Sequence, residues 1–124
     1  MTVHHIAIRV ADLARSEAFY GGVLGLPVVR RWSDDAGKPR SVWLELGSGA
    51  FLAVELADAS GPTQNGLFAL AIATAERQIW RARLAGAGIP VERESPYTLY
   101  LRDPDGNLVG LSHWPEACAA PCST

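Results

Sequence analysis

The sequence has few of the features that would assign it to a specialised class of protein. Its net charge is only −2, with 11 Lys and Arg against 13 Asp and Glu, so it has no basic surplus for binding nucleic acid. Its apolar runs, such as residues 67–73, are far shorter than the roughly 20 residues of a membrane-spanning helix. Residues 1–5 lack the basic region and apolar core of a signal peptide. We therefore expect a cytoplasmic globular protein that binds neither nucleic acid nor membranes.

Cysteine is also scarce. The only two, Cys118 and Cys122, lie near the C-terminal end. Their spacing matches neither a redox motif nor a zinc ribbon, and no second pair accompanies them. Because chain ends are usually poorly ordered, we expect residues 116–124 to form a mobile tail, and we assign these thiols no role.

The length of 124 residues is that of one domain, and the first half of the chain has a clear order of elements. An N-cap signal at Asp12 and a stop at Gly25 bound a helix that ends at about Leu24. Alternating or apolar runs predict four strands. These strands cover residues 5–10, 28–32, 41–46 and 51–56. The predicted order is β-α-β-β-β.

The second half repeats this order after a segment rich in small and polar residues, 57–66, which we interpret as a linker. A strand is predicted over residues 67–73, a helix over 74–85 and a short strand from Ile89. The Gly-Leu-Pro-Val sequence at 25–28 is matched by Gly-Ile-Pro-Val at 88–91. The match indicates an internal repeat, with modules at about 3–56 and 67–113 in one domain that ends near residue 115.

A hairpin closes the second half. Two apolar runs within residues 100–111 flank the sequence Asp-Pro-Asp-Gly at 103–106. Proline presets φ for a turn, and glycine adopts the left-handed conformation that returns the chain to a strand. The turn fixes which residues of the last two strands share a face.

One face of the first predicted sheet is unusually polar. Strand alternation places five side chains on the face away from the helix: His5, Arg9, Trp43, Glu45 and Glu55. This set is too polar for an ordinary core. Two such sheets curving around one space would form a cleft, which is the usual geometry of a small-molecule site.

Three stretches of the sequence resemble a known family. They are residues 4–10 (HHIAIRV), 16–26 (SEAFYGGVLGL) and 103–107 (DPDGN). They resemble the vicinal oxygen chelate superfamily, which includes glyoxalase I, bleomycin-resistance and fosfomycin-resistance proteins and extradiol dioxygenases. The resemblance implies an α+β, glyoxalase-like fold, in which two βαβββ modules form a curved mixed sheet or half-barrel cleft. It also implies a homodimer.

In metal-dependent members, the resemblance implies ligands on the first and last strands of each module. The first module supplies His5 and Glu55. The second has Ala69, or Phe68 if the register slips by one residue, and Gly110, none of which has a donor atom for a metal. We therefore expect no metal cofactor. The alternative is one divalent ion (Ni, Zn, Co, Mn or Fe) at His5 and Glu55, with Glu45 as a substitute ligand.

Two other histidines are candidates for metal binding only by residue type. By strand alternation, His4 should lie on the face opposite His5, and His113 should point away from the cleft. His5 itself is either a residual ligand or general base, or it pairs with Glu55. Arg9 and Arg102 either hold an anionic ligand or pair with carboxylates.

The small residues of the second module leave space in the expected cleft, unless a large neighbour such as Trp43 fills it. Around that space the sequence offers aromatic and charged side chains suited to a flat or partly apolar molecule. The candidate ligand-binding residues are His5, Arg9, Trp43, Glu45, Phe51, Glu55, Ala69, Ala71, Tyr100, Arg102 and Gly110.

Three functions fit these features. The first is a small-molecule-binding protein of the glyoxalase and bleomycin-resistance type with an incomplete metal site. The second is a divalent-metal-dependent lyase or isomerase of the glyoxalase I kind, in which His5 and Glu55 are the only candidate catalytic residues. The third is a structural or regulatory domain whose cleft is filled by its own side chains.

Overall fold

The computed structural model describes residues 2–58 and 67–118. The chain divides into two compact units, Met1–Gln64 and Asn65–Thr124, and we call their described parts the first and second modules. Most of the predicted linker and tail, including Cys122, lies outside the described residues. Cys118 is disulfide-bonded.

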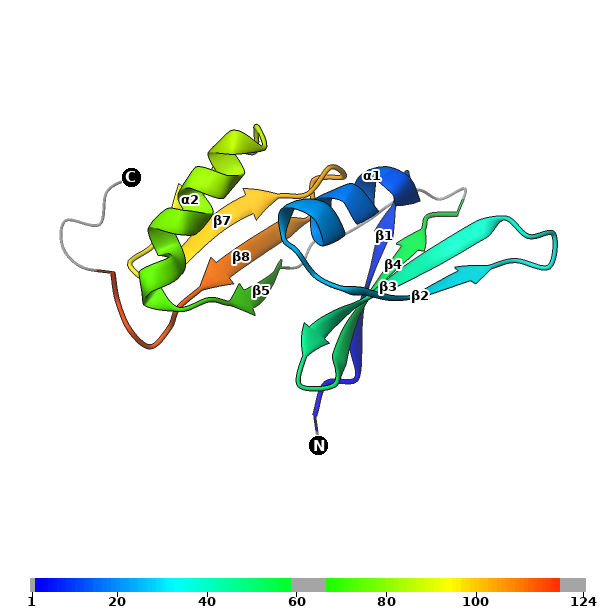
Figure 1. The fold of residues 1–124 in the computed structure, drawn as a ribbon, viewed down its shortest axis with the longest axis horizontal. Coiled ribbons are helices and arrows are strands. Elements are labelled where there is room, and N and C mark those ends of the chain that lie inside the picture. The colour runs from blue at the N-terminus through cyan, green and yellow to red at the C-terminus, as the bar shows by residue number, and fades with distance from the viewer. Residues whose placement is uncertain (1, 59–66, 119–124) are drawn as a thin grey trace. The chain divides into compact units, whose positions relative to one another are not determined.

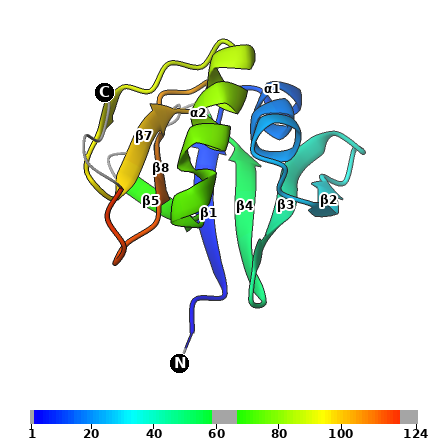
Figure 2. The ribbon, with the colours of Figure 1, turned by 60° about the vertical axis from the view of Figure 1, so that its left-hand side comes forward.

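The first module has the predicted βαβββ order (Figure 1). Its elements are β1 (His5–Val10), α1 (Leu13–Glu17), the helical turn η1 (Ala18–Val23), β2 (Val28–Ser33), β3 (Pro39–Gly47) and β4 (Ala50–Leu56). The strands form one open mixed sheet in the order β1-β4-β3-β2, as Figure 2 shows. The β1–β4 pair is parallel, and the other two pairs are antiparallel.

The helix of this module begins and ends where the sequence predicts, but it is not uniform. The Asp12 side chain accepts a hydrogen bond of 3.0 Å from the backbone N–H of Arg15, which caps α1. From Ala18 the coil widens into a π-helix, in which the N–H of Leu24 donates to the carbonyl of Phe19, five residues back. Gly25, with φ of 76°, then ends the helix.

The core of the first module lies between this helix and one face of its sheet. Phe19 and Tyr20 are buried on the helix side, and α1 packs against β3 and β4. The buried strand residues are Ile8, Val10, Val42, Leu44, Leu52 and Val54. Their alternation leaves the other face of the sheet free of the helix.

The second module repeats this order. Its elements are β5 (Leu67–Ala71), the 3₁₀ turn η2 (Thr74–Glu76), α2 (Arg77–Gly86), β6 (Arg93–Glu94), β7 (Thr98–Arg102) and β8 (Leu108–Ser112). The strand order is β5-β8-β7-β6, with β5 and β8 parallel. In Figure 1, α2 lies across one face of this sheet. The chain therefore has the α+β fold of two βαβββ modules that the sequence predicts.

One predicted strand is nearly absent. The strand expected from Ile89 begins only at Arg93 and has two residues. Pro90 has no N–H to donate to a neighbouring strand. Only the N–H of Glu92, which donates to the carbonyl of Tyr100 at 2.8 Å, extends the pairing toward it.

The terminal hairpin is formed as predicted. In its turn the N–H of Asp103 donates to the carbonyl of Asn107 at 2.9 Å. The buried Asp103 carboxylate accepts from the N–H groups of Asp105 and Asn107 and from the Asn107 side-chain amide, at 2.8–2.9 Å. Gly106 has φ of 85°. The carboxylate therefore fixes the turn at three points and sets the register of β7 and β8.

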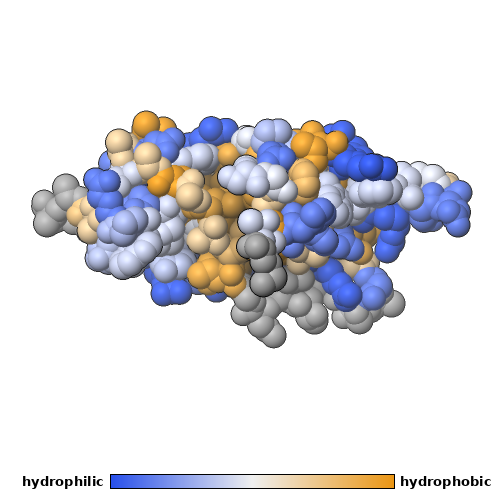
Figure 3. All heavy atoms as spheres, turned by 90° about the horizontal axis from the view of Figure 1, so that it is seen from below, coloured by the Kyte–Doolittle hydropathy of each residue, from blue (hydrophilic) through white to orange (hydrophobic). Residues whose placement is uncertain are grey.

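The surface mixes polar and apolar residues. Figure 3 shows hydrophobic and hydrophilic residues interleaved on the face it presents. The large hydrophobic residues that are exposed are Val3, Val29, Trp32, Leu67, Ile79 and Trp114. Within the described ranges, none of the helices has both the length and the apolar character that crossing a membrane requires.

Candidate functional site

The helix-free face of the first sheet carries all six predicted site residues of the first half. Strand pairing arranges this face in three rows across β1, β4 and β3. The rows are His5, Phe51 and Glu45; Ala7, Ala53 and Trp43; and Arg9, Glu55 and Ser41. Successive rows are two residues apart, so the outer rows are about 13 Å apart. We call this surface the β1–β4–β3 face.

One end of the β1–β4–β3 face is aromatic. The ring centroids of His5 and Trp43 are 4.9 Å apart, with an angle of 34° between the ring planes. Trp43 and Phe51 are 5.9 Å apart. The His4 ring contacts both, at 6.4 Å from Trp43 and 5.9 Å from Phe51. Four rings therefore gather at this end of the sheet.

The position of His4 corrects the sequence analysis. We expected His4 on the opposite face from His5, but its Nδ1 atom lies 2.9 Å from the Nδ1 atom of His5. His4 precedes β1, so strand alternation does not govern the direction of its side chain. Its carbonyl accepts from the N–H of Phe51 at 3.0 Å, which holds its backbone beside β4.

The other end of the β1–β4–β3 face is charged. Arg9 and Glu55 are direct partners in the β1–β4 ladder, and both are exposed. Arg9 forms an ion pair with Asp58, with 3.9 Å between Nη1 and Oδ2. Glu45, at the aromatic end, accepts a hydrogen bond of 3.0 Å from the backbone N–H of Gly47. The face thus offers charges of both signs within reach of the aromatic rings.

The predicted residues of the second half also share one face of their sheet. Ala69, Gly110 and Tyr100 form one row across β5, β8 and β7. Ala71 lies one step along β5 on the same face, and Arg102 is on that face of β7. The guanidinium group of Arg93 lies 4.1 Å from the centre of the Tyr100 ring.

Gly110 leaves less room than the sequence suggests. A Cβ atom at this position would lie 3.1 Å from Cγ2 of Thr98 and 3.2 Å from Cβ of Ala69. Both distances are shorter than an ordinary carbon–carbon contact. A side chain here requires its neighbours to move by a few tenths of an ångström.

Arg102 is already engaged. Its Nε and Nη2 donate to both oxygens of Glu92 at 2.7 and 3.0 Å, and its Nη1 donates to the carbonyl of Gly106 at 3.0 Å. The hydrogen bonds from Arg102 lower the pKa of Glu92. Both side chains are nearly half exposed, so the ion pair can exchange with a bound anion.

A buried polar cluster lies on the helix side of the second sheet. Arg77 of α2 donates to Glu94 at 2.9 Å and to the carbonyl of Ser95 at 2.8 Å, and Arg81 donates to the second oxygen of Glu94. Arg77 also lies 2.8 Å from Nε2 of His113. Sequence reasoning missed this cluster, because nothing local to β6 indicates that Glu94 faces α2.

His113 points into this cluster, and its tautomer follows from its neighbours. Arginine only donates hydrogen bonds, so Nε2 of His113 accepts from Arg77. The ring proton is then on Nδ1, which donates to the carbonyl of Glu116 at 2.5 Å. His113 thus serves to join the chain after β8 to α2.

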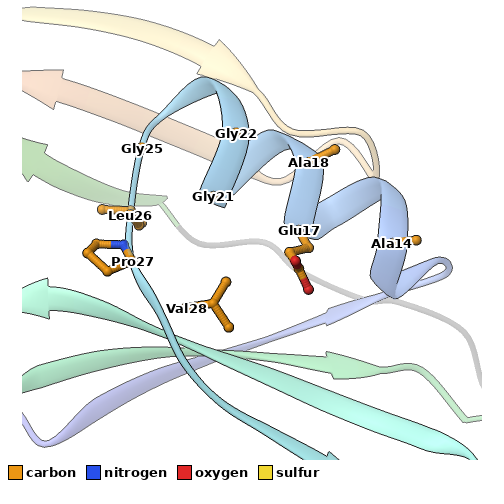
Figure 4. Close-up of a pocket in the computed structure, with 9 residues that line it drawn as sticks. All are labelled: Ala14, Glu17, Ala18, Gly21, Gly22, Gly25, Leu26, Pro27 and Val28. Atoms are coloured by element: carbon orange, nitrogen blue, oxygen red, sulfur yellow. The ribbon is translucent and has the colours of Figure 1, made fainter.

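Three grooves lie away from the predicted site residues. The groove in Figure 4, about 490 Å³, lies between the first helix and the segment that follows it. Its lining residues are Ala14, Glu17, Ala18, Gly21, Gly22, Gly25, Leu26, Pro27 and Val28. Glu17 faces this groove, and Arg31 donates to both of its carboxylate oxygens at 2.8 and 3.3 Å.

The other two grooves are bordered by different elements. One, about 260 Å³, lies between α1 and the β2–β3 hairpin and includes Trp32. The other, about 640 Å³, lies beside the end of α2 and is lined by residues between Arg81 and Val91. None of the three includes a predicted site residue.

The metal ligands implied by the resemblance do not fit together on one ion within the first module. His5 and Glu55 lie in the two outer rows, four residues apart along the strands, which separates their backbones by about 13 Å. Metal ligands lie only about 2.0–2.2 Å from the ion. Residues 2–58 and 67–118 contain no group of three or more His, Cys, Asp or Glu residues arranged to hold a metal.

Comparison with known proteins gives a consistent picture. The model of the Glyoxalase/Bleomycin resistance protein/Dioxygenase superfamily matches residues 2–111. Lactoylglutathione lyase from Agrobacterium tumefaciens is 27% identical, with a TM-score of 0.74 and coverage of 91% of this chain and 93% of that one. A glyoxalase/dioxygenase from Nostoc punctiforme is 22% identical, with a TM-score of 0.72 and coverage of 93% and 92%. No curated protein sequence matches the chain.

A third relative corrects the expectation about cofactors. The fosfomycin resistance protein FosX from Listeria monocytogenes, in its E126Q form, was solved with Mn(II) and 1S,2S-dihydroxypropylphosphonic acid. It is 20% identical, with a TM-score of 0.74 and coverage of 90% of both chains. The prediction of no metal cofactor is therefore contradicted. The prediction rested on Ala69 and Gly110 alone. Two positions without a donor atom do not exclude metal ligands elsewhere in the fold.

Proposed function

Because the chain belongs to the Glyoxalase/Bleomycin resistance protein/Dioxygenase superfamily, we propose that it binds a small organic molecule on the β1–β4–β3 face. The observation that carries this proposal is the arrangement of that face. Trp43 lies at its centre with the His5 and Phe51 rings on one side, and the charged Arg9 and Glu55 lie at the other end.

This arrangement suits a flat, partly apolar ligand. Aromatic rings offer a large contact area without requiring a hydrogen-bonding partner. Offset stacking between two rings contributes about 0.5–1.5 kcal/mol in addition to the free energy of burying their surface. Arg9 and Glu55 then select a ligand with a polar or charged group about 13 Å or less from its ring. The face spans a length suited to a single small molecule.

We propose that the second module, taken by itself, has a candidate ligand-binding face of its own. Ala69, Ala71, Tyr100, Arg102 and Gly110 share the corresponding face of their own sheet. Small residues there admit a ligand close to the backbone, while Tyr100 and Arg102 provide a ring and a cation. A homodimer and a cytoplasmic location stay predictions from the sequence.

Binding can be measured by calorimetry with a fixed panel of three probes: bleomycin, fosfomycin and the hemithioacetal of methylglyoxal and glutathione. We expect at least one to bind, and Trp43→Ala to weaken that binding at least about tenfold. The matched control is Trp32→Ala, which removes a tryptophan that is 42% exposed on β2. Equal losses in both variants would count against the proposed face.

A second candidate is a divalent-metal-dependent lyase or isomerase of the glyoxalase I kind. It is favoured by the 27% identity to lactoylglutathione lyase over 91% of the chain. It predicts that the hemithioacetal is converted to S-lactoylglutathione when Ni(II), Zn(II), Co(II) or Mn(II) is supplied. Absence of turnover with all four ions, in protein shown to be folded, would eliminate this candidate.

A further inference from the structure

The groove between α1 and the β2–β3 hairpin of the first module has the character of a site for a small molecule. Its surface is mostly apolar, and Leu13, Pro39 and Val42 are among the residues that line it. Its volume of about 260 Å³ is below the roughly 300–1,000 Å³ typical of sites for drug-sized ligands. The groove therefore suits a molecule with about one six-membered ring.

The two charged residues that line this groove are paired with each other. Arg31 donates from Nε and Nη2 to the two carboxylate oxygens of Glu17, at 3.3 and 2.8 Å. The side chains are unequally exposed, with 63% for Arg31 and 32% for Glu17. An ion pair so open to solvent is weak. When it opens, the long Arg31 side chain can turn into water, whereas Glu17 stays beside the groove and needs another cation.

We propose that this groove binds a small primary amine with an apolar body, and that the ammonium group replaces Arg31 on Glu17. An ammonium group has three N–H donors, and an ionised carboxylate accepts them on both oxygens. The apolar body leaves water for the walls at Leu13, Pro39 and Val42. An anion is disfavoured, because it would have to displace Glu17, which is the less exposed partner and is held on α1.

Glu17 also borders the groove of Figure 4. That groove has less apolar surface, and Gly21, Gly22 and Gly25 are among its lining residues. Contact with an apolar body therefore favours the side of the hairpin over the side of the glycines. The proposal is separate from the proposed function, because this groove shares none of the predicted ligand-binding residues.

The test is a titration of the full chain with benzylamine, followed by calorimetry and by the amide resonances of labelled protein. Benzyl alcohol and benzoate share the same ring and serve as comparison probes. We expect benzylamine to bind, with the largest shifts within residues 13–17, 31–33 and 39–42. The other two probes should bind at least about tenfold more weakly, because neither can donate charged hydrogen bonds to Glu17.

Two variants should change the affinity for benzylamine in opposite directions. Glu17→Gln should weaken binding at least about tenfold, because it removes the carboxylate charge. Arg31→Ala should strengthen binding about two- to fivefold, because it removes the competing cation of a weak pair. Asp35→Asn is the matched control, since it neutralises an exposed carboxylate of the same hairpin, and its affinity should equal that of the wild type.

Several results would overturn the proposal, with circular dichroism confirming that each variant is folded. They are no binding of benzylamine by the wild type, equal binding of benzyl alcohol, and affinity that survives Glu17→Gln or falls in Arg31→Ala. Shifts confined to residues 21–28 or to the β1–β4–β3 face would also overturn it. Bleomycin, fosfomycin and the hemithioacetal take no part in this test, so its failure is distinguishable from a failure of the proposed function.

Discussion

At the scale of single residues, Gly110 shows how closely the second sheet is packed. Its missing Cβ would lie 3.1 Å from Thr98 Cγ2. We predict that Gly110→Ala destabilises the protein by about 1 kcal/mol, because crowding outweighs the lower chain entropy of alanine. In a Thr98→Ser background, which keeps the hydroxyl bond to Ser112, the same change should cost less. Urea unfolding of the wild type, the two single variants and the double variant measures how far the two substitutions are coupled. If their effects simply add, Thr98 does not restrict position 110.

Glu94 carries a buried charge in the second module. It is 7% exposed and binds both Arg77 and Arg81. Glu94→Gln removes the buried carboxylate charge that Arg77 and Arg81 both bind, so we expect a loss of about 3 kcal/mol in the free energy of unfolding. The control is Glu92→Gln, whose pair with Arg102 is nearly half exposed on both sides and should matter little. Similar losses in both variants would refute this ranking.

The same residue predicts a pH dependence. Burial raises the pKa of Glu94, but the hydrogen bonds and charges of Arg77 and Arg81 outweigh it, and the net pKa lies below the ordinary 4.5. As pH falls below 4.5, the unfolded state takes up the proton first. The contribution of Glu94 is therefore complete above pH 4.5 and is lost as pH falls through its lowered pKa. Urea midpoints of wild type and Glu94→Gln should converge in acid, and a constant difference would contradict this.

The residues of the candidate site divide into those that sequence can place and those that it cannot. Alternation within β1, β3 and β4 is enough to put His5, Trp43 and Glu55 on one face. It fails for His4, which lies outside the strand, and it does not give the row that each residue occupies. Ladder register is a tertiary property, and that register is what separates His5 from Glu55.

At the scale of elements, the terminal hairpin depends on one backbone conformation. Gly106 has φ of 85°, and a Cβ there would meet nothing within 4 Å. The cost of a substitution is therefore conformational, and we expect Gly106→Ala to destabilise by about 1–2 kcal/mol. Gly86, at the end of α2, also has open space but no positive φ, so Gly86→Ala should not destabilise. Thermal or urea unfolding compares them, and equal effects would argue against strain at Gly106.

Elements were predictable where local chemistry determines them. The Asp12 cap, the Gly25 stop and the turn at residues 103–106 rest on side chains and glycines next to the backbone they fix. The π-helical stretch at Ala18–Val23 was not predictable, since its apolar pattern also fits an α-helix. β6 is short because Pro90 has no N–H to donate to a neighbouring strand. This effect was not predictable, since it depends on which strand lies beside Pro90 in the folded sheet.

At the scale of the whole molecule, the chain is two copies of one arrangement. Both modules pair their first and last strands in parallel and place a helix on one face. The Gly-Leu-Pro-Val and Gly-Ile-Pro-Val sequences indicated this repeat, because they mark the same helix exit in each half. The two modules have nonetheless diverged in chemistry. The first gathers rings and charges on its open face, whereas the second has alanine and glycine at its centre.

The most direct test of this account maps a bound molecule onto the protein. Amide resonances of isotopically labelled protein would be recorded with and without bleomycin, fosfomycin and the hemithioacetal. The account predicts that the largest shifts fall on β1, β3 and β4 around Trp43 and disappear in Trp43→Ala but not in Trp32→Ala. Shifts confined to the grooves beside Glu17 or Arg81, or no shifts with any of the three, would contradict it.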